Sequence, residues 1–267
     1  MIFGINRPIV LAALLLLGGL VPIVATNVWA ETFVGTNDDD SIDGTSEDDV
    51  IKGLGGNDHL NGLDGNDKIK GGDGDDVIDG GEGNNEITGN KGDDKIVFRS
   101  SGDNSISGGK GNDQIDVGPA DGVCCAGHHT ISGGKGDDQI VASASAAVIE
   151  GGKGNDTITG IDTASTFSGG KGNDELSILG EGGGTVHGNG GNDRLTLNTD
   201  TSATAFGNKG DDFFLADFGG TTMYGGKGDD TFVSDNNGDH NTFIGGPGAD
   251  NFVCGEGIDT IVDFDPD

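Results

Sequence analysis

A nine-residue phrase, Gly-x-x-Gly-x-Asp-x-apolar-x, recurs along nearly the whole chain beyond residue 34. Its sixth place is Asp in every copy but one, where Asn85 stands, and its eighth place is always Ile, Leu or Phe. Such self-similarity indicates a repeat architecture, in which each unit buries its apolar side chain only by stacking on its neighbours. The fifteen copies begin at Gly35, Gly44, Gly53, Gly62, Gly71, Gly80, Gly89, Gly108, Gly133, Gly151, Gly169, Gly188, Gly207, Gly225 and Gly245.

One phrase predicts one tight turn followed by one short strand. In the copy from Gly71 to Asp79, the glycines permit positive φ and a close approach of the backbone. The last three residues then run extended, with Ile78 pointing inward and its two neighbours pointing outward, as the period of a strand requires. Two phrases therefore form one coil. We expect an all-β fold, a parallel β-roll (β-solenoid) of stacked, roughly 18-residue coils, as a single domain over residues 31–267.

The spacing of the phrases predicts that the two edges of this roll differ. Phrases begin every nine residues from Gly35 to Gly89 and every 18 to 25 residues thereafter. We call the edge that keeps its turn in every coil the continuous edge. Its twelve turns begin at Gly35, Gly53, Gly71, Gly89, Gly108, Gly133, Gly151, Gly169, Gly188, Gly207, Gly225 and Gly245. The other, which we call the opposite edge, has full turns at Gly44, Gly62 and Gly80, degenerates, and recovers near Gly255.

The strands on the degenerate side are nevertheless expected to persist. An apolar residue stands two places before the next glycine in seven of the later coils, where an inward-pointing side chain should lie. These residues are Ile106, Ile131, Ile149, Phe167, Val186, Met223 and Phe243. The prediction is therefore a complete roll of two sheets, with the full turn along the whole continuous edge and only at the ends of the other.

The phrase resembles the calcium-binding nonapeptide of RTX (repeats-in-toxin, haemolysin-type) proteins, from Gly35 almost to the last residue. That resemblance implies multiple Ca²⁺ ions between successive coils, held by turn carbonyls and sixth-place carboxylates. Ca²⁺ suits such a site because it accepts six to eight oxygen ligands in flexible geometry. The implied ligands are Asp40, Asp49, Asp58, Asp67, Asp76, Asp94, Asp113, Asp138, Asp156, Asp174, Asp193, Asp212, Asp230, Asp250 and, in the recovered turn, Asp259.

Charge and composition also point to a divalent cation as the missing partner. The chain has 14 basic and 46 acidic residues, a formal charge of −32, with 32% hydrophobic and 5% aromatic residues. Such a composition is close to that of disordered chains, which bury too little apolar surface to offset their entropy. The charge predicts repulsion from nucleic acid and from anionic membrane surfaces.

Residues 1–30 are predicted to be a secretory signal peptide. Arg7 precedes an almost wholly apolar run over residues 9–25, and Val28-Trp29-Ala30 resembles a cleavage site. The alternative is an uncleaved anchor, since the run is close to the ~17 residues needed to span a bilayer. After cleavage no membrane span is expected, and the protein would be secreted or held at the cell surface.

A loop insertion is predicted around residues 118–130, where the coil is longer than its neighbours. It contains Cys124, Cys125, His128 and His129, whose thiols and imidazoles are ligand types for Zn²⁺ or Cu. Adjacent ligands strain tetrahedral closure, however, and the spacing matches no standard zinc pattern. The residues therefore favour a loop without a metal ion. A vicinal disulfide, free thiols or pairing between chains all remain open for the two cysteines.

Lysine recurs at the third place of the phrase, and two interpretations are open for it. The lysines either neutralise the carboxylate-rich edge locally, which is the simpler interpretation, or form a basic stripe that binds an anionic polymer or mineral surface. They are Lys91, Lys110, Lys135, Lys153, Lys171, Lys209 and Lys227.

The function predicted from the sequence is a non-enzymatic, exported, calcium-binding protein that folds on binding Ca²⁺. No set of His, carboxylate and Ser residues stands at a meaningful spacing, so no catalytic residues are predicted. The chief alternative is a surface adhesion or envelope-structural protein whose partner is a cell-surface glycan or another envelope component. A polysaccharide-modifying enzyme is a remote third alternative.

Overall fold

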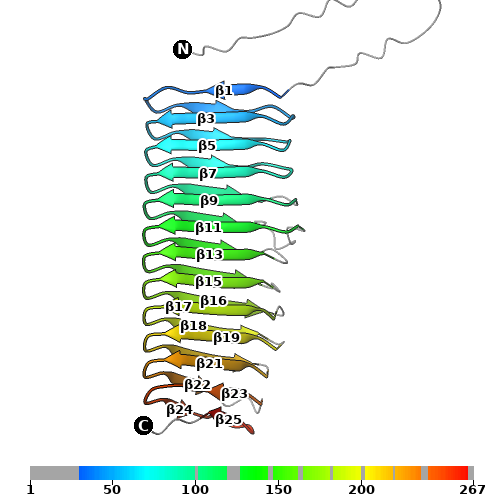
Figure 1. Cartoon of the computed structure of the whole chain (residues 1–267). Coiled ribbons are helices and arrows are strands. Elements are labelled where there is room, and N and C mark those ends of the chain that lie inside the picture. Colours follow the sequence, from blue (N-terminus) through cyan, green and yellow to red (C-terminus); the bar gives the residue numbers. More distant parts are fainter. Residues whose placement is uncertain are drawn as a thin grey trace, which may run out of the picture.

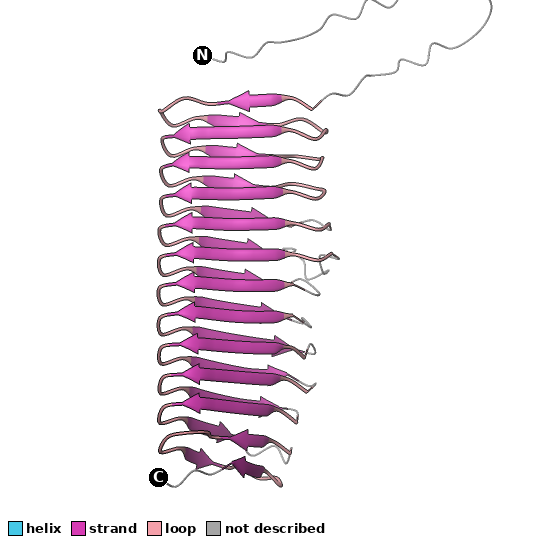
Figure 2. Ribbon diagram, in the orientation of Figure 1, coloured by secondary structure: helices cyan, strands magenta, loops and turns pink. Residues whose placement is uncertain are grey.

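The computed structural model describes residues 30–99, 102–118, 127–143, 147–161, 165–180, 183–199, 202–218, 220–235 and 240–263. In this part of the chain all regular structure is β-strand, and the strands stack into one elongated rod (Figures 1 and 2). Successive strands alternate between two parallel sheets, one of thirteen strands and one of twelve. The predicted parallel β-roll is thus confirmed. No helix long and apolar enough to cross a membrane occurs within these ranges.

The odd-numbered strands form the first sheet, which faces the viewer in Figure 1. They are β1 (Thr32–Val34), β3 (Val50–Gly55), β5 (Lys68–Asp73), β7 (Glu86–Lys91), β9 (Ser105–Lys110), β11 (Thr130–Lys135), β13 (Val148–Lys153), β15 (Thr166–Lys171), β17 (Thr185–Gly190), β19 (Thr204–Lys209), β21 (Thr222–Lys227), β23 (Thr242–Ile244) and β25 (Thr260–Asp263).

The even-numbered strands form the second sheet, behind the first. They are β2 (Ser41–Asp43), β4 (His59–Asn61), β6 (Val77–Asp79), β8 (Lys95–Phe98), β10 (Gln114–Val117), β12 (Gln139–Ala142), β14 (Thr157–Ile161), β16 (Glu175–Gly180), β18 (Arg194–Thr199), β20 (Phe213–Phe218), β22 (Thr231–Ser234) and β24 (Asn251–Val253).

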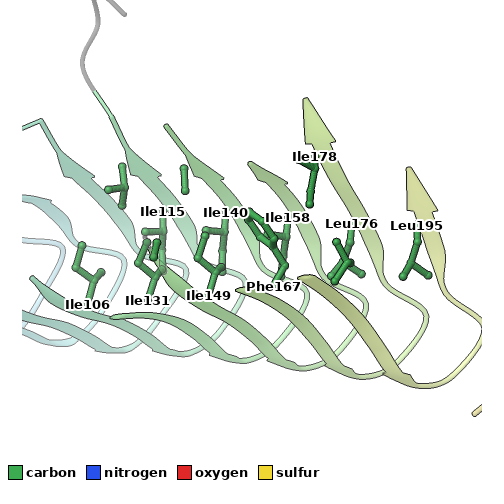
Figure 3. Packing of buried hydrophobic residues seen from close by; sticks show 14 of the residues in the cluster. Ile106, Ile115, Ile131, Ile140, Ile149, Ile158, Phe167, Leu176, Ile178 and Leu195 are labelled. Atoms are coloured by element: carbon green, nitrogen blue, oxygen red, sulfur yellow. The ribbon is translucent and has the colours of Figure 1, made fainter. Parts of the chain in front are cut away.

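The core is built from two facing rows of apolar side chains, one from each sheet. Eighth-place residues such as Ile115, Ile140 and Ile158 pair in register along the second sheet. Ile106, Ile131 and Ile149 do the same along the first sheet, and Figure 3 shows the two rows pointing toward each other. All seven inward residues predicted for the degenerate coils are at most 2% exposed. Their burial confirms that the strands persist where the turn motif is lost.

The core changes its side chains toward the end of the chain. Phe214 and Phe232 stack with ring centroids 4.7 Å apart, and Phe232 stacks on Phe252 at 5.0 Å. Ala205 occupies the facing row in the coil that contributes Phe214, and it is fully buried. A small residue opposite a large one conserves the volume between the sheets, so the coil accommodates the ring without widening.

The two edges differ as the phrase spacing predicts. Turns of one shape connect each odd strand to the next even strand along the left edge of Figure 1, which is the continuous edge. The number of residues between an even strand and the next odd strand, on the opposite edge, varies beyond β8. The predicted insertion lies there, between Gly118 and Gly127, and residues 119–126 are outside the described ranges.

Candidate calcium-binding edge

The sixth-place carboxylates form a hydrogen-bonded ladder along the continuous edge. Each side chain is buried at the base of its turn, at most 2% exposed from Asp58 to Asp230. One carboxylate oxygen, Oδ1, accepts a hydrogen bond from the backbone N–H of the equivalent Asp in the preceding coil. Asp113 Oδ1 accepts from Asp94 N at 2.9 Å, and Asp138 Oδ1 from Asp113 N at 2.8 Å. The ladder therefore fixes the position of every carboxylate relative to the coil before it.

A second ladder runs through the fifth place in the opposite sense. Asn57 Oδ1 accepts from Asp75 N at 2.9 Å, and Asp75 Oδ1 accepts from Asp93 N at 2.8 Å, so each of these side chains reaches the following coil. Each turn is thus tied to both of its neighbours. The sequence shows the Asp or Asn at this place, but its role follows only from the stacking.

The second carboxylate oxygen, Oδ2, is left without a hydrogen bond in ten turns of the continuous edge and in one turn of the opposite edge, at Asp67. Among the described residues these oxygens are buried and have no hydrogen-bond partner. They belong to Asp58, Asp67, Asp76, Asp94, Asp113, Asp138, Asp156, Asp174, Asp193, Asp212 and Asp230. A buried, unpaired anionic oxygen is costly, and one such atom in a native fold requires an explanation. A repeating row of them indicates a repeating cation.

The first-place glycine leaves room for that oxygen. A Cβ added at Gly53 would lie 2.0 Å from Asp58 Oδ2 and 2.6 Å from the carbonyl oxygen of Gly71, one coil further on. At Gly225 the corresponding distances are 2.1 Å to Asp230 Oδ2 and 2.7 Å to Gly245 O. Carboxylate and carbonyl oxygens thus converge on a space that any side chain would fill. Oxygen-only ligands of this kind fit Ca²⁺, and each turn could supply them from its Asp side chain and its backbone carbonyls.

Burial strongly disfavours the charged form of these carboxylates when no cation is bound. Desolvation raises the pKa of Asp94, Asp113, Asp138 and Asp212 to about 7, partly offset by the backbone N–H donors. The pKa is raised to about 6, mainly by the same desolvation, for Asp67, Asp76, Asp156, Asp174, Asp193 and Asp230. At neutral pH the folded rod therefore needs either protons or a cation at these sites.

This shift predicts how stability depends on pH without metal. Because the folded pKa lies above the unfolded value of 3.8, the metal-free fold is favoured below that value and loses this stability as pH rises through 6 to 7. In metal-stripped buffer we therefore expect more β-structure at pH 4.5 than at pH 8, as measured by far-UV circular dichroism. Equal or smaller β content at pH 4.5 would contradict the burial of these carboxylates.

The opposite edge replaces the carboxylate with neutral groups after its first turns. Asn85 occupies the sixth place, and its Nδ2 donates to the carbonyl oxygens of Gly80 at 3.1 Å and Glu82 at 3.4 Å. In the next coil Asn104 Nδ2 donates to Gly102 O at 3.1 Å. These amide groups satisfy turn carbonyls that a cation would otherwise contact. The turns at Asn85 and Asn104 are therefore tied by neutral amide groups at the sixth place.

Beyond these turns an apolar side chain replaces the first-place glycine of the opposite edge in most coils. Register aligns Phe98 with Val117 and Val117 with Ala142, and Ile178 and Leu197 stand in the same row further along, after Gly160. All five of these apolar side chains are fully buried. At Gly160 the ring of Phe167 takes the place of a side chain, since an added Cβ would lie 2.2 Å from its Cζ. The space that receives a carboxylate oxygen on the continuous edge is therefore filled with hydrocarbon through the middle of this edge. Sequence reasoning missed this row, although the apolar residue two places after each eighth-place residue is visible in the sequence.

At the ends of the roll the predicted ligands have other partners. Asp40 Oδ2 accepts from Thr36 Oγ1 and Asp49 Oδ2 from Thr45 Oγ1, both at 2.9 Å. Asp259 Oδ1 accepts from Asn241 N at 3.0 Å, and its Oδ2 accepts from Ser234 Oγ at 2.7 Å. Asp250 is half-buried, and its Oδ1 accepts from Asp230 N at 2.9 Å. Hydroxyl groups thus provide at several terminal turns what a cation would provide in the interior.

The Cys-His segment falls partly outside the described residues, because Cys124 and Cys125 are not among them. His129 is buried in the sixth-place row and lies with Nδ1 3.3 Å from Asn104 Nδ2. His128 is exposed, and its N–H donates to Asp103 Oδ1 at 2.7 Å. Within the described part of the chain, no group of three or more His, Cys, Asp or Glu side chains could hold a metal ion. The zinc or copper alternative thus falls outside the described residues, and a Ca²⁺ site within them would rely largely on backbone carbonyls.

Comparison with protein families agrees with this geometry. The chain matches the family described as the RTX calcium-binding nonapeptide repeat (4 copies) over residues 34–69, 61–96, 100–122, 126–158, 143–176, 197–232 and 237–261. No curated protein matches the chain. Because these matches cover most of the sequence and coincide with the stacked turns, the chain belongs to the RTX family of calcium-binding β-roll repeats.

Proposed function

We propose that this protein is an exported, non-enzymatic β-roll whose folding is coupled to Ca²⁺ binding. The observation that carries the proposal is the set of eleven buried Oδ2 atoms without hydrogen bonds, ten in a row along the continuous edge and one at Asp67. Each of these oxygens lies beside a first-place glycine, whose missing side chain leaves space for an ion. Without cations, burying this row of carboxylates opposes folding, whereas ions that bind only the folded state stabilise it.

The proposed ions occupy the continuous edge from Asp58 to Asp230, and one further site lies at Asp67 on the opposite edge. At Asp40, Asp49 and Asp259 hydroxyl groups already serve the second oxygen, so we propose weaker binding there. Export is supported by the signal-like pattern of residues 1–30, nearly all of which lie outside the described ranges. Millimolar extracellular Ca²⁺ would match the affinity of roughly 10⁻⁴ to 10⁻³ M of extracellular calcium modules.

Anomalous diffraction from crystals grown with Ca²⁺ tests the distribution of sites. We expect calcium peaks between successive turns along the continuous edge from Gly53 to Gly245. We expect none in the opposite edge beside Phe98, Val117 and Ala142, because these side chains fill the space. Equal occupancy of both edges through the middle of the rod would contradict the proposal.

A further inference from the structure

A row of lysines follows the continuous edge on the outer side of the first sheet. Lys91, Lys110, Lys135, Lys153 and Lys171 pair in register in five consecutive coils. Lys91 forms an ion pair with Asp73 at 2.7 Å, whereas none within 4 Å is found for the other four inside the described ranges. Like charges directly opposite one another across strands are destabilising. Each such pair is therefore unfavourable by itself, and an anion lying against the row would relieve the repulsion.

A row of glycines runs beside these lysines and forms the floor of a groove. The second place is Gly in four successive coils, at Gly109, Gly134, Gly152 and Gly170, and Asn90 and Asn189 occupy the same row at its two ends. All four glycines have φ between 116° and 124°. A Cβ at Gly134 would lie 2.4 Å from the carbonyl oxygen of Gly109, so a larger residue there would be strained. At the strand spacing the four glycines span roughly 15 Å along the rod.

The lysines form one wall of this groove, and the second wall carries hydroxyl, carboxylate and amide groups. These groups and two of the lysines line one groove of about 410 Å³. The residues that line it are Ser132, Glu150, Ser168, Asn189, Lys153 and Lys171, with Gly134, Gly152 and Gly170 between the two walls. Asn189 Nδ2 donates to Ser168 Oγ at 2.9 Å and holds that end of the wall. The groove thus offers cations on one side and hydrogen-bonding groups on the other.

We propose that this groove binds a segment of a linear acidic polysaccharide lying parallel to the rod axis. A polymer with one acidic group and several hydroxyls per unit complements both walls, the lysines taking the acidic groups and Ser132, Glu150 and Ser168 the hydroxyls. The lysines repeat every coil, at ~4.8 Å, which is comparable with the length of one sugar unit. Charge complementarity therefore recurs along the chain of the polymer.

The charge of the whole protein opposes an anionic partner, but calcium reverses the charge of this edge. The five turns from Gly89 to Asp174 contain five Lys and seven Asp residues, a formal charge of −2. One Ca²⁺ in each of the four intervals between them would bring the charge to +6. This part of the inference rests on the proposed function, because it requires calcium at the sixth-place carboxylates. A cationic edge of this kind attracts polyanions over about a Debye length.

Isothermal titration calorimetry with a hexamer of galacturonic acid, at saturating Ca²⁺ and low ionic strength, tests the proposal on the chain from Glu31. We expect the hexamer to bind, and neutral maltohexaose not to bind. The triple variant Lys135→Gln, Lys153→Gln, Lys171→Gln should weaken binding by at least about tenfold, since three charged contacts are removed. The matched variant Lys52→Gln, Lys70→Gln, Lys95→Gln has the same formal charge and alters lysines outside the row. It should change affinity by less than about twofold.

Circular dichroism of the same samples separates the two proposals. A rod that folds with Ca²⁺ but does not bind the hexamer would overturn the groove assignment and leave the calcium function intact. Equal loss of affinity in both triple variants would also overturn it, because the effect would then come from overall charge alone. Tighter binding of polyphosphate, which has no sugar hydroxyls, would contradict the polysaccharide. A chain without β-structure at saturating Ca²⁺ would refute the proposed function and this inference with it.

Discussion

Removing calcium is expected to convert the chain from Glu31 to Asp267 from a folded β-rod into an expanded coil at neutral pH. Without cations, the buried Asp carboxylates must either ionise without a partner or bind protons, and both oppose folding at that pH. Each site with a dissociation constant of 10⁻⁴ to 10⁻³ M would contribute about 1.4 to 2.7 kcal/mol at 10 mM Ca²⁺. Summed over the continuous edge, this contribution is large compared with the stability of an ordinary domain.

Far-UV circular dichroism during a Ca²⁺ titration measures this transition. We expect a cooperative coil-to-β change near millimolar Ca²⁺, because each coil contacts only its neighbours and a folded coil templates the next. Mg²⁺ at the same concentrations should not reproduce it, since Mg²⁺ requires stricter octahedral geometry and dehydrates reluctantly. A full β signal already present in chelator at pH 7.5 would show that the apolar ladder suffices, and calcium would then be only a secondary ligand.

Replacing Gly151 with alanine is expected to disrupt the calcium ladder in the middle of the rod. The added Cβ would lie 2.4 Å from Asp156 Oδ2 and 2.7 Å from Asp156 Cβ, so the carboxylate must move out of its buried position. Overpacking of this kind costs about 1 to 3 kcal/mol, and the loss of the carboxylate from its site removes the calcium contribution as well. We expect a higher Ca²⁺ midpoint and a lower thermal midpoint at saturating Ca²⁺.

Gly190→Ala is the matched control for this variant. Gly190 is a third-place glycine of the same edge, and the nearest atom to an added Cβ is the carbonyl oxygen of Gly170 at 3.8 Å. Neither Gly151 nor Gly190 has a positive φ, so the two variants differ in space and not in backbone strain. Gly190→Ala should stay within about 0.5 kcal/mol of the parent chain. A Gly151→Ala variant that behaves like this control would contradict a site at Asp156.

The architecture could be predicted from the sequence because, in a repeat protein, the same short pattern determines both the local structure and the way the coils stack. The two-residue period around Ile78 and its equivalents determines which side chains point inward, and the spacing of the phrases determines how the coils align. The persistence of strands at Ile106 and Val186, where one turn motif is lost, followed from the same register. The asymmetry of the two edges is likewise visible as a change from nine-residue to roughly 18-residue spacing.

Whether the second carboxylate oxygen of each site has a hydrogen-bond partner depends on contacts that form only in the stacked structure. The sequence presents Asp40 and Asp76 in the same motif, yet Thr36 hydrogen-bonds the second oxygen of Asp40, whereas that of Asp76 is buried without a partner. Asn85 stands where the neighbouring phrases have Asp, and its amide donates a hydrogen bond to a turn carbonyl. In the neighbouring turns the same place holds a buried anionic oxygen without a hydrogen bond.

The sequence by itself therefore determined the roll, its inward residues and the positions of its carboxylates, since these depend on periodicity along the chain. The tertiary structure decided which carboxylates lack a hydrogen bond, which side chains fill the opposite edge, and that three glycines and two lysines of the repeated rows line one groove. These features depend on residues about one coil apart, and their side chains meet only when the coils stack in register.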